Sequence, residues 1–142
     1  MLSLAIINGP NLNLVGTREP EIYGSTSLNE YLESLANQYP GITLQTYQSN
    51  IEGELINYLH QCKGKTDAII INAGAYTHTS IALADAIAAI NIPTIEVHVS
   101  NVLAREDFRK HSYIASKCTG SISGLGLEGY RLAIEFFIKG NK

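Results

Sequence analysis

The sequence predicts an α/β domain built around a five-stranded parallel sheet. Short apolar runs alternate with longer helical patterns, the connections between them are short, and no linker, repeat or low-complexity segment interrupts them. Strands that alternate with helices are joined by right-handed crossovers, which make neighbouring strands parallel. A chain of 142 residues, 45% hydrophobic and 16% charged, can bury one core without disulfides or metals. We therefore expect a single domain over residues 1–142.

Five segments are predicted to be strands. Residues 4–7 (LAII) and 68–71 (AIII) are continuous apolar runs, as in strands with helices over both faces. Residues 94–99 (TIEVHV) form a third strand, 42–48 (ITLQTYQ) alternate as an edge strand does, and 120–124 (GSISG) form a weaker fifth. The natural arrangement of these strands is a flavodoxin-like three-layer sandwich with strand order 2-1-3-4-5.

Four helices are expected beside these strands. The first follows Ser27, which has capping-box spacing to Glu30, and it ends at Pro40-Gly41. The others cover residues 52–62, about 80–90 and 127–138.

Composition narrows the classes of partner. The net charge of -3, with no long Lys/Arg cluster, argues against nucleic acid or an anionic membrane and leaves a small polar or anionic metabolite. Cys62 and Cys118 fit neither a metal motif nor a disulfide scaffold, and free thiols suit a reducing cytoplasm. We expect no signal peptide at the start of the chain and no membrane span, because no apolar run is long enough.

Three polar segments point to where a ligand would bind. In open parallel sheets, ligands lie beyond the carboxyl ends of the strands at the switch point, here between strands one and three. The segments at or just after the ends of strands one, three and four are rich in Asn, His, Ser, Thr and Arg. They are residues 8–26, 72–80 and 98–106. We expect the three segments to converge on one crevice.

The first of these segments carries a candidate base. The connection over residues 8–24 is longer than a usual βα turn. A phenol with a pKa of about 10 is a weak base at pH 7, but a guanidinium within reach lowers that pKa by about 1 to 3 units. A turn at Pro20 would let Arg18 reach Tyr23. The alternative is that Arg18 pairs with a neighbouring glutamate at the surface, with little energetic effect.

The fourth predicted strand carries a candidate acid. Glu96 and His98 are two residues apart and therefore share one face of the strand. A carboxylate beside an imidazole stabilises the protonated imidazole that general acid catalysis needs. The alternatives are a structural ion pair, or a histidine that meets solvent at the strand end.

The polar loop residues have two interpretations. Asn8, Asn11 and Asn13 are turn formers by default, but their amides could orient a water or support an oxyanion. Asn72 and His78 present the same choice after the third strand.

Missing motifs argue against nicotinamide, nucleotide-phosphate and serine-hydrolase chemistry. The sequence has no G-x-G-x-x-G after the first strand, no G-x-x-x-x-G-K-[ST], no G-x-S-x-G and no H-E-x-x-H. Two rivals to an enzyme remain: a non-catalytic module that binds an anionic metabolite or flavin, and a phosphoryl-accepting receiver domain. A receiver domain needs acidic residues where this chain has Asn8 and Asn72.

Taken together, the motifs resemble those of one family, the type II 3-dehydroquinate dehydratases. Val15 replaces the leucine that is more usual in that family, a conservative change. The matching segments are residues 8–24, 72–80, 96–101, 104–106, 108–109 and 123–130.

The resemblance implies trans elimination of water from 3-dehydroquinate, through an enolate, to give 3-dehydroshikimate in the shikimate pathway. It implies neither cofactor nor metal. Tyr23 would be the base, with its pKa lowered by Arg18, on a loop that closes over the substrate. Asn11 would hold a water that stabilises the enolate, and His98, oriented by Glu96, would protonate the departing hydroxyl.

The resemblance also implies substrate contacts and an assembly. Val99 would supply backbone amide donors, and Asp85 would reach toward a neighbouring subunit's site in a dodecamer made of four trimers. Contacts with the hydroxyl groups and carboxylate of the substrate would come from Asn72, His78, Ser100 and Arg109. Whether the enzyme serves biosynthesis of aromatic amino acids or breakdown of quinate stays open.

Overall fold

A parallel sheet of five strands forms the centre of the protein. In the computed structural model, which describes residues 1–16 and 27–140, the strand order is β2-β1-β3-β4-β5. This order and the parallel pairing confirm the predicted flavodoxin-like fold class, and β2 is the edge strand that its alternating pattern indicated. The strands are β1 (Leu2–Asn8), β2 (Ile42–Gln48), β3 (Ala68–Asn72), β4 (Thr94–His98) and β5 (Gly120–Ser123).

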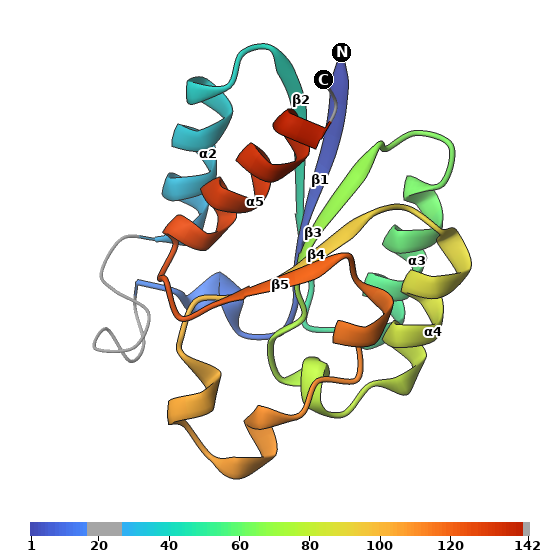
Figure 1. The fold of residues 1–142 in the computed structure, drawn as a ribbon, viewed down its shortest axis with the longest axis vertical. Coiled ribbons are helices and arrows are strands. Elements are labelled where there is room, and N and C mark those ends of the chain that lie inside the picture. Colours follow the sequence, from blue (N-terminus) through green and yellow to red (C-terminus); the bar gives the residue numbers. More distant parts are fainter. Residues whose placement is uncertain (17–26, 141–142) are drawn as a thin grey trace.

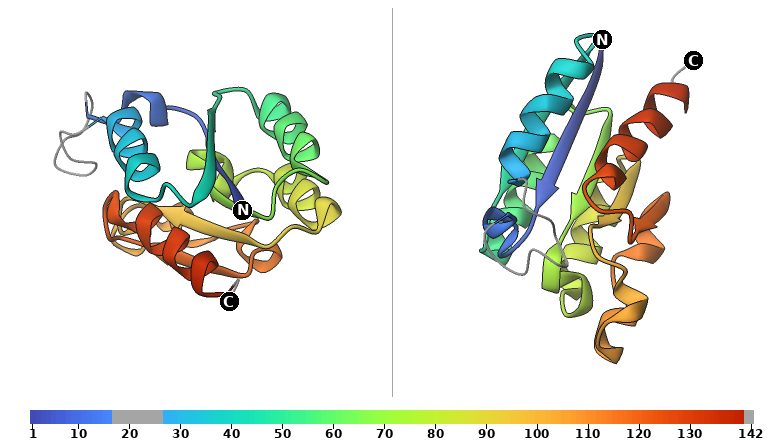
Figure 2. Two further views of the ribbon diagram at one scale, coloured as in Figure 1. Left: turned by 90° about the horizontal axis from the view of Figure 1, so that it is seen from above. Right: turned by 90° about the vertical axis from the view of Figure 1, so that its left-hand side faces the viewer.

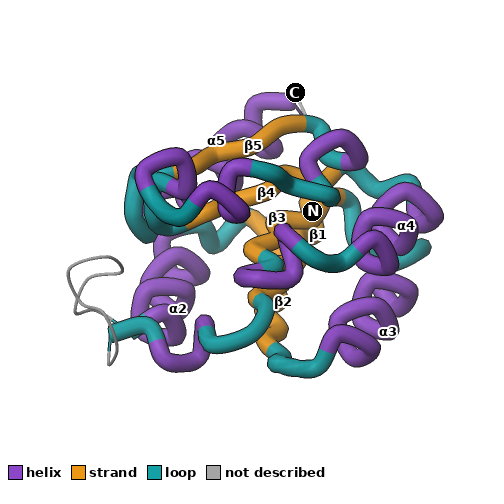
Figure 3. Tube along the Cα trace, turned by 90° about the horizontal axis from the view of Figure 1, so that it is seen from below, coloured by secondary structure: helices purple, strands orange, loops and turns teal. Residues whose placement is uncertain are grey.

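Helices cover both faces of the sheet. Figure 3 shows α2 and α5 on one side of the row of strands and α3 and α4 on the other, and Figure 2 shows the same layers from two further directions. Side chains alternate along β1: Leu4 and Ile6 pack in the core under α2 and α5, whereas Ala5 and Ile7 pack under α3 and α4. The helices are α2 (Leu28–Gln38), α3 (Glu52–Cys62), α4 (Ile81–Ile90) and α5 (Glu128–Gly140).

Local sequence explains where two of these helices begin. The Ser27 side chain accepts a hydrogen bond from the backbone N–H of Glu30, and the Ser80 side chain accepts one from Leu83. Asn91 ends α4 in the left-handed conformation that asparagine tolerates. Within residues 1–16 and 27–140, no helix is long and apolar enough to cross a membrane.

The carboxyl ends of the strands are the polar end of the molecule. Asn8 and Asn72, the last residues of β1 and β3, are direct partners in the sheet register. Of the five short 3-10 turns in the described residues, four follow the carboxyl ends of β1, β3 and β4, in the lower half of Figure 1, and the fifth precedes β5. These turns are η1 (Leu12–Leu14), η2 (Gly74–His78), η3 (Val102–Ala104), η4 (Asp107–Lys110) and η5 (Ala115–Lys117).

Gly9 allows the loops after β1 and β3 to touch. Its N–H donates to the Asn72 carbonyl at 2.7 Å, which brings the two chains together just beyond the strand ends. A Cβ atom at position 9 would lie 2.4 Å from the carbonyl oxygen of Ala73, closer than real contacts allow. The polar end of the sheet therefore depends on the missing side chain at this position.

We expect Gly9→Ala to destabilise the protein by about 1–3 kcal/mol, because overpacking forces two backbone segments apart. Gly53→Ala is the matched control: a Cβ there meets nothing within 4 Å, and alanine favours helix α3. Urea unfolding of the two variants measures the difference. Equal midpoints for Gly9→Ala and the wild type would contradict the expectation.

Candidate active site

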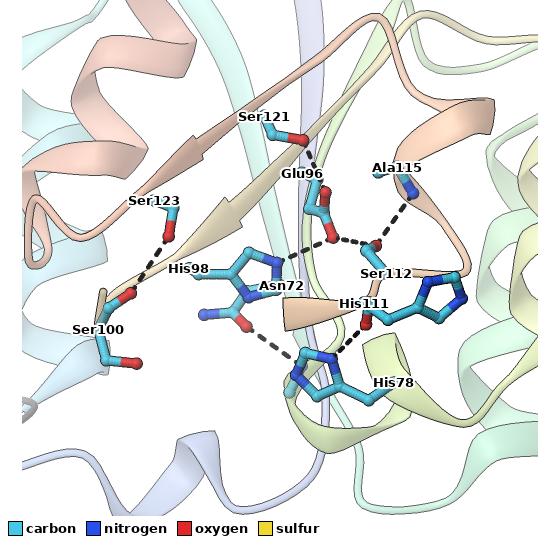
Figure 4. Close-up of polar contacts among 11 residues, drawn as sticks. Asn72, His78, Glu96, His98, Ser100, His111, Ser112, Ala115, Ser121 and Ser123 are labelled. Atoms are coloured by element: carbon cyan, nitrogen blue, oxygen red, sulfur yellow. Dashed lines mark hydrogen bonds and ion pairs between the residues drawn. The ribbon is translucent and has the colours of Figure 1, made fainter. Parts of the chain in front are cut away.

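A buried carboxylate and imidazole meet at the end of β4. His98 Nε2 lies 2.8 Å from Glu96 Oε2, and both residues are buried, with exposed fractions of 8% and 2%. Because a carboxylate only accepts, Nε2 carries a proton and Nδ1 remains as the second ring nitrogen for a ligand. The contact predicted from their spacing is confirmed, and Figure 4 shows the two side chains projecting from the same strand.

Glu96 is satisfied by three donors from three segments. Besides His98, the Ser112 hydroxyl donates to Oε2 at 2.6 Å and the Ser121 hydroxyl donates to Oε1 at 2.6 Å. Burial raises the pKa of the Glu96 carboxyl, but these hydrogen bonds outweigh it, so the pKa lies below its ordinary value. Glu96 is therefore charged at neutral pH, and its negative charge lies directly against the His98 ring.

A second histidine lies beside the first. The rings of His78 and His98 have centroids 6.3 Å apart, and His78 Nδ1 lies 2.7 Å from the carbonyl oxygen of His111. Since a carbonyl only accepts, Nδ1 carries the proton, and Nε2 of the neutral ring is an acceptor. Burial lowers the pKa of His78, and the nearby positive charges of His98 and Arg109 act in the same direction. The site thus places an imidazole of lowered pKa, His78, beside the His98 ring.

Asn72 is held by a buried network across the switch point. Its Nδ2 donates to the Tyr130 hydroxyl at 3.0 Å, that hydroxyl donates to Asn8 Oδ1 at 2.6 Å, and Asn72 Oδ1 accepts from the Gly74 N–H at 3.1 Å. Burial raises the pKa of the Tyr130 phenol well above its ordinary value, so it keeps its proton to donate. These bonds fix the orientation of the amide, and one N–H of Asn72 remains for a ligand.

Asn11 adopts a turn conformation in the loop after β1. It has a left-handed backbone, and its N–H donates to Asn50 Oδ1 at 3.0 Å. Gln48 Nε2 bridges this loop because three oxygens lie within hydrogen-bonding distance of its two N–H groups: the Gly9 carbonyl, Asn50 Oδ1 and, at 3.4 Å, Asn13 Oδ1. The turn-forming interpretation of Asn11 is confirmed. The Asn11 side chain is exposed and does not cap the 3-10 turn that follows it.

The segment after β4 carries the remaining predicted contacts. The buried Val99 is held by its carbonyl, which accepts from the Gly126 N–H, and Ser100 Oγ accepts from Arg105 Nη1 at 3.2 Å. Arg109 Nε donates to Glu106 at 2.9 Å, and the Arg109 charge is close enough to lower the pKa of His78. Val99 and Ser100 directly follow His98 along the chain, and Arg109 acts on His78.

Three predicted site residues do not join this group in the described structure. Arg18 and Tyr23 lie outside residues 1–16 and 27–140. Asp85 is exposed on α4. Across the described part of the chain, no three His, Cys, Asp or Glu side chains are grouped as metal ligands would be.

Sequence reasoning missed several residues that organise the site. Ser112, Ser121 and the His111 carbonyl hold the Glu96 and His78 side chains, and Tyr130 holds Asn72. Tyr130 is the last residue of segment 123–130, which resembles the family, so the sequence could have pointed to it. The two serines lie in segments without a recognisable motif.

With the geometry established, comparison with known proteins identifies the family. The model of the dehydroquinase class II family matches residues 2–138. The chain belongs to the class II dehydroquinases. It is 57% identical over 135 residues to the catabolic 3-dehydroquinase of Emericella nidulans, covering 94% of this chain and 88% of that one. It is 54% identical over 140 residues to the 3-dehydroquinate dehydratase of Erwinia tasmaniensis, covering 97% and 93%.

Solved structures of class II dehydroquinases have the same fold. The type II dehydroquinase of Butyrivibrio crossotus superposes with a TM-score of 0.90 at 46% identity, covering 95% of this chain and 96% of that one. The enzyme from Propionibacterium acnes gives a TM-score of 0.91 at 38% identity, covering 96% of each chain. The family, fold and hydro-lyase class predicted from the sequence are confirmed.

We expect His78 of this class II dehydroquinase to titrate below the ordinary histidine pKa of about 6.5, with its neutral proton on Nδ1. A depressed pKa in the folded state means that the unfolded chain binds the proton more tightly. The stability contributed by neutral His78 is complete above the ordinary pKa and is lost as pH falls toward the lower folded value. Heteronuclear NMR of the imidazole nitrogens measures both properties, and a dominant Nε2–H form would contradict them.

Proposed function

We propose that this protein is a 3-dehydroquinate dehydratase that eliminates water from 3-dehydroquinate by a trans route through an enolate, giving 3-dehydroshikimate. The observation that carries the proposal is the buried Glu96–His98 pair at the carboxyl end of β4, in a chain of the class II dehydroquinase family. A binding module needs no such pair, whereas a dehydratase needs an acid for its leaving hydroxyl.

His98 is the proposed general acid. The ionised Glu96 occupies Nε2, so Nδ1–H of the imidazolium is the donor left for the substrate. As the enolate returns to the ketone, its electrons form the C1–C2 double bond and the C1–O bond breaks, and the departing hydroxyl takes this proton and leaves as water. The remaining neutral imidazole is held in place by the same carboxylate, ready for reprotonation.

Tyr23 is the proposed base, with its pKa lowered by Arg18. The phenolate takes the proton alpha to the ketone, and the bonding electrons move onto the ketone oxygen as an enolate. Asn11 is proposed to hold a water that donates to this oxygen, and its exposed side chain in the turn after β1 supports that role. The base and its tuning cation are proposed from the sequence, since both lie outside the described residues.

Substrate contacts are proposed for the polar groups around the two histidines. The remaining N–H of Asn72 suits a hydroxyl oxygen, and the Nε2 acceptor of His78 suits a hydroxyl proton. Ser100, the Val99 backbone amide and Arg109 suit the substrate carboxylate. The reaction as proposed uses acid, base and oxyanion support from the protein alone and requires no cofactor or metal.

The domain organisation, assembly and pathway of the enzyme are also proposed. We propose that residues 1–142 form one catalytic domain, that four trimers assemble into a cytoplasmic dodecamer, and that the exposed Asp85 of α4 reaches a neighbouring subunit's site. The step belongs to the shikimate pathway of aromatic amino acid biosynthesis. A role in quinate breakdown is the alternative, and the name of the Emericella nidulans relative favours it.

A direct assay tests the function. We expect 3-dehydroquinate mixed with the protein to give the ultraviolet absorbance of a conjugated enone, and His98→Asn to lower kcat by about 10²- to 10⁴-fold through loss of the acid. His60→Asn, on α3, is the matched control with unchanged activity. Folded wild-type protein without turnover would favour the binding module, and full activity of His98→Asn would remove His98 from the mechanism.

A second experiment tests the base. Tyr23→Phe removes the phenol and is expected to lower kcat by about 10²- to 10⁴-fold while substrate binding stays near that of the wild type. Tyr58→Phe on α3, where the ring stacks on Tyr47, is the matched control with normal turnover. Binding is measured by calorimetry and turnover by enone absorbance. Substantial turnover by Tyr23→Phe would assign the base to another residue.

A further inference from the structure

Residues 111–113 contact groups that hold the two histidines of the site, His78 and His98. The His111 carbonyl accepts from His78 Nδ1 at 2.7 Å, and the Ser112 hydroxyl donates to Glu96 at 2.6 Å. The Tyr113 N–H donates to the Thr77 carbonyl at 2.9 Å, which ties the segment to η2. Figure 4 shows Ser112 and the His111 carbonyl between the Glu96 carboxylate and the His78 ring.

We propose that Ser112 is a positioning residue that holds the Glu96 carboxylate, and through it the His98 imidazole, in the orientation that proton transfer requires. The inference rests on the proposed function, because it assigns Ser112 a part in the step that His98 carries out. Ser112 itself need not contact the substrate.

The direction of the Ser112 hydroxyl is set by its own partners. Its oxygen accepts from the Ala115 N–H at 3.1 Å, at the start of η5. A hydroxyl has a single proton, and here that proton is directed to Glu96 Oε2. A local turn thus aims the donor before any ligand arrives.

Ser112 donates to the same Glu96 oxygen that accepts from His98. Oε2 accepts from both His98 Nε2 and Ser112, whereas Ser121 donates to Oε1 from β5. Donors on both oxygens prevent rotation of the carboxylate about its last bond. Oε2 is therefore kept in line with the imidazole, and its negative charge is stabilised by the hydroxyl.

Loss of the Ser112 donor should change how Glu96 titrates. The titratable groups whose charges act with Glu96 are His98 on β4, His78 on η2 and the Cys118 thiol before β5. Burial and the Glu96 charge raise the pKa of Cys118 to about 12, so this thiol stays neutral. Without the hydroxyl, the pKa of Glu96 rises, and the acidic limb of the activity profile moves to higher pH.

The two imidazoles are coupled through one peptide unit. The His111 carbonyl belongs to the same peptide plane as the Ser112 N–H, so a change in the position of Ser112 also moves the acceptor of His78. One short segment therefore supplies the acceptor of His78 directly and, through Ser112, contacts the acceptor of His98.

The test compares Ser112→Ala with Ser116→Ala, an exposed serine on η5. We expect Ser112→Ala to lower kcat about tenfold, with KM within about twofold of the wild type, and to move the acidic limb upward. Ser116→Ala should match the wild type, and Ser112→Thr, which keeps a hydroxyl, should restore most of the loss. NMR titration of His98 without substrate should show a changed response in Ser112→Ala alone.

An unmoved acidic limb and an unmoved His98 titration in Ser112→Ala would overturn the proposal, even if kcat fell, because a merely structural role lowers activity without shifting protonation. If Ser112→Ala does not fold, Ser112→Cys, with a weak donor of similar size, takes its place under the same criteria. The NMR titration needs no turnover, so it tests the positioning role even if the proposed dehydratase activity proves wrong.

Discussion

The structure depends on placing one negative charge inside the sheet. An unpaired carboxylate buried as deeply as Glu96 would cost several kcal/mol, and a central strand cannot solvate it. The charge is tolerated because His98, Ser112 and Ser121 all donate to it. These donors come from β4, the connection before η5, and β5, so the requirement of one side chain fixes three parts of the chain relative to one another. The same requirement places an imidazole against a negative charge, the arrangement on which the proposed acid role of His98 depends.

A second constraint acts at the neighbouring strand ends. Asn8 and Asn72 finish β1 and β3 in register, and both are buried, so their amides need partners. Tyr130 of α5 supplies them with one hydroxyl, which accepts from one amide and donates to the other. The packing of α5 against the sheet therefore also orients a residue of the site. The bonds that satisfy these buried polar groups therefore also orient the amide of Asn72, a proposed substrate contact.

Much of the fold was readable from local pattern. Ser27 and Ser80 begin their helices through side-chain caps, and the apolar runs in β1 and β3 have helices on both faces because their side chains alternate between two cores. The strand limits were less accurate: β1 runs from Leu2 to Asn8, two residues beyond the apolar run at its start and one at its end. Strand pairing, which extends to polar residues such as Asn8, decided those limits, and hydropathy does not record pairing.

By itself, the sequence determined the alternation of strands and helices, from which the usual arrangement of such folds gave the strand order and the ligand-bearing edge, and short-range geometry along one strand gave the meeting of Glu96 with His98. The tertiary structure alone decided which loops supply the remaining partners. Ser112 and Ser121 lie 16 and 25 residues from Glu96, and Tyr130 lies 122 residues from Asn8. No spacing rule connects residues so far apart, since their contact depends on the path of every turn and helix between them.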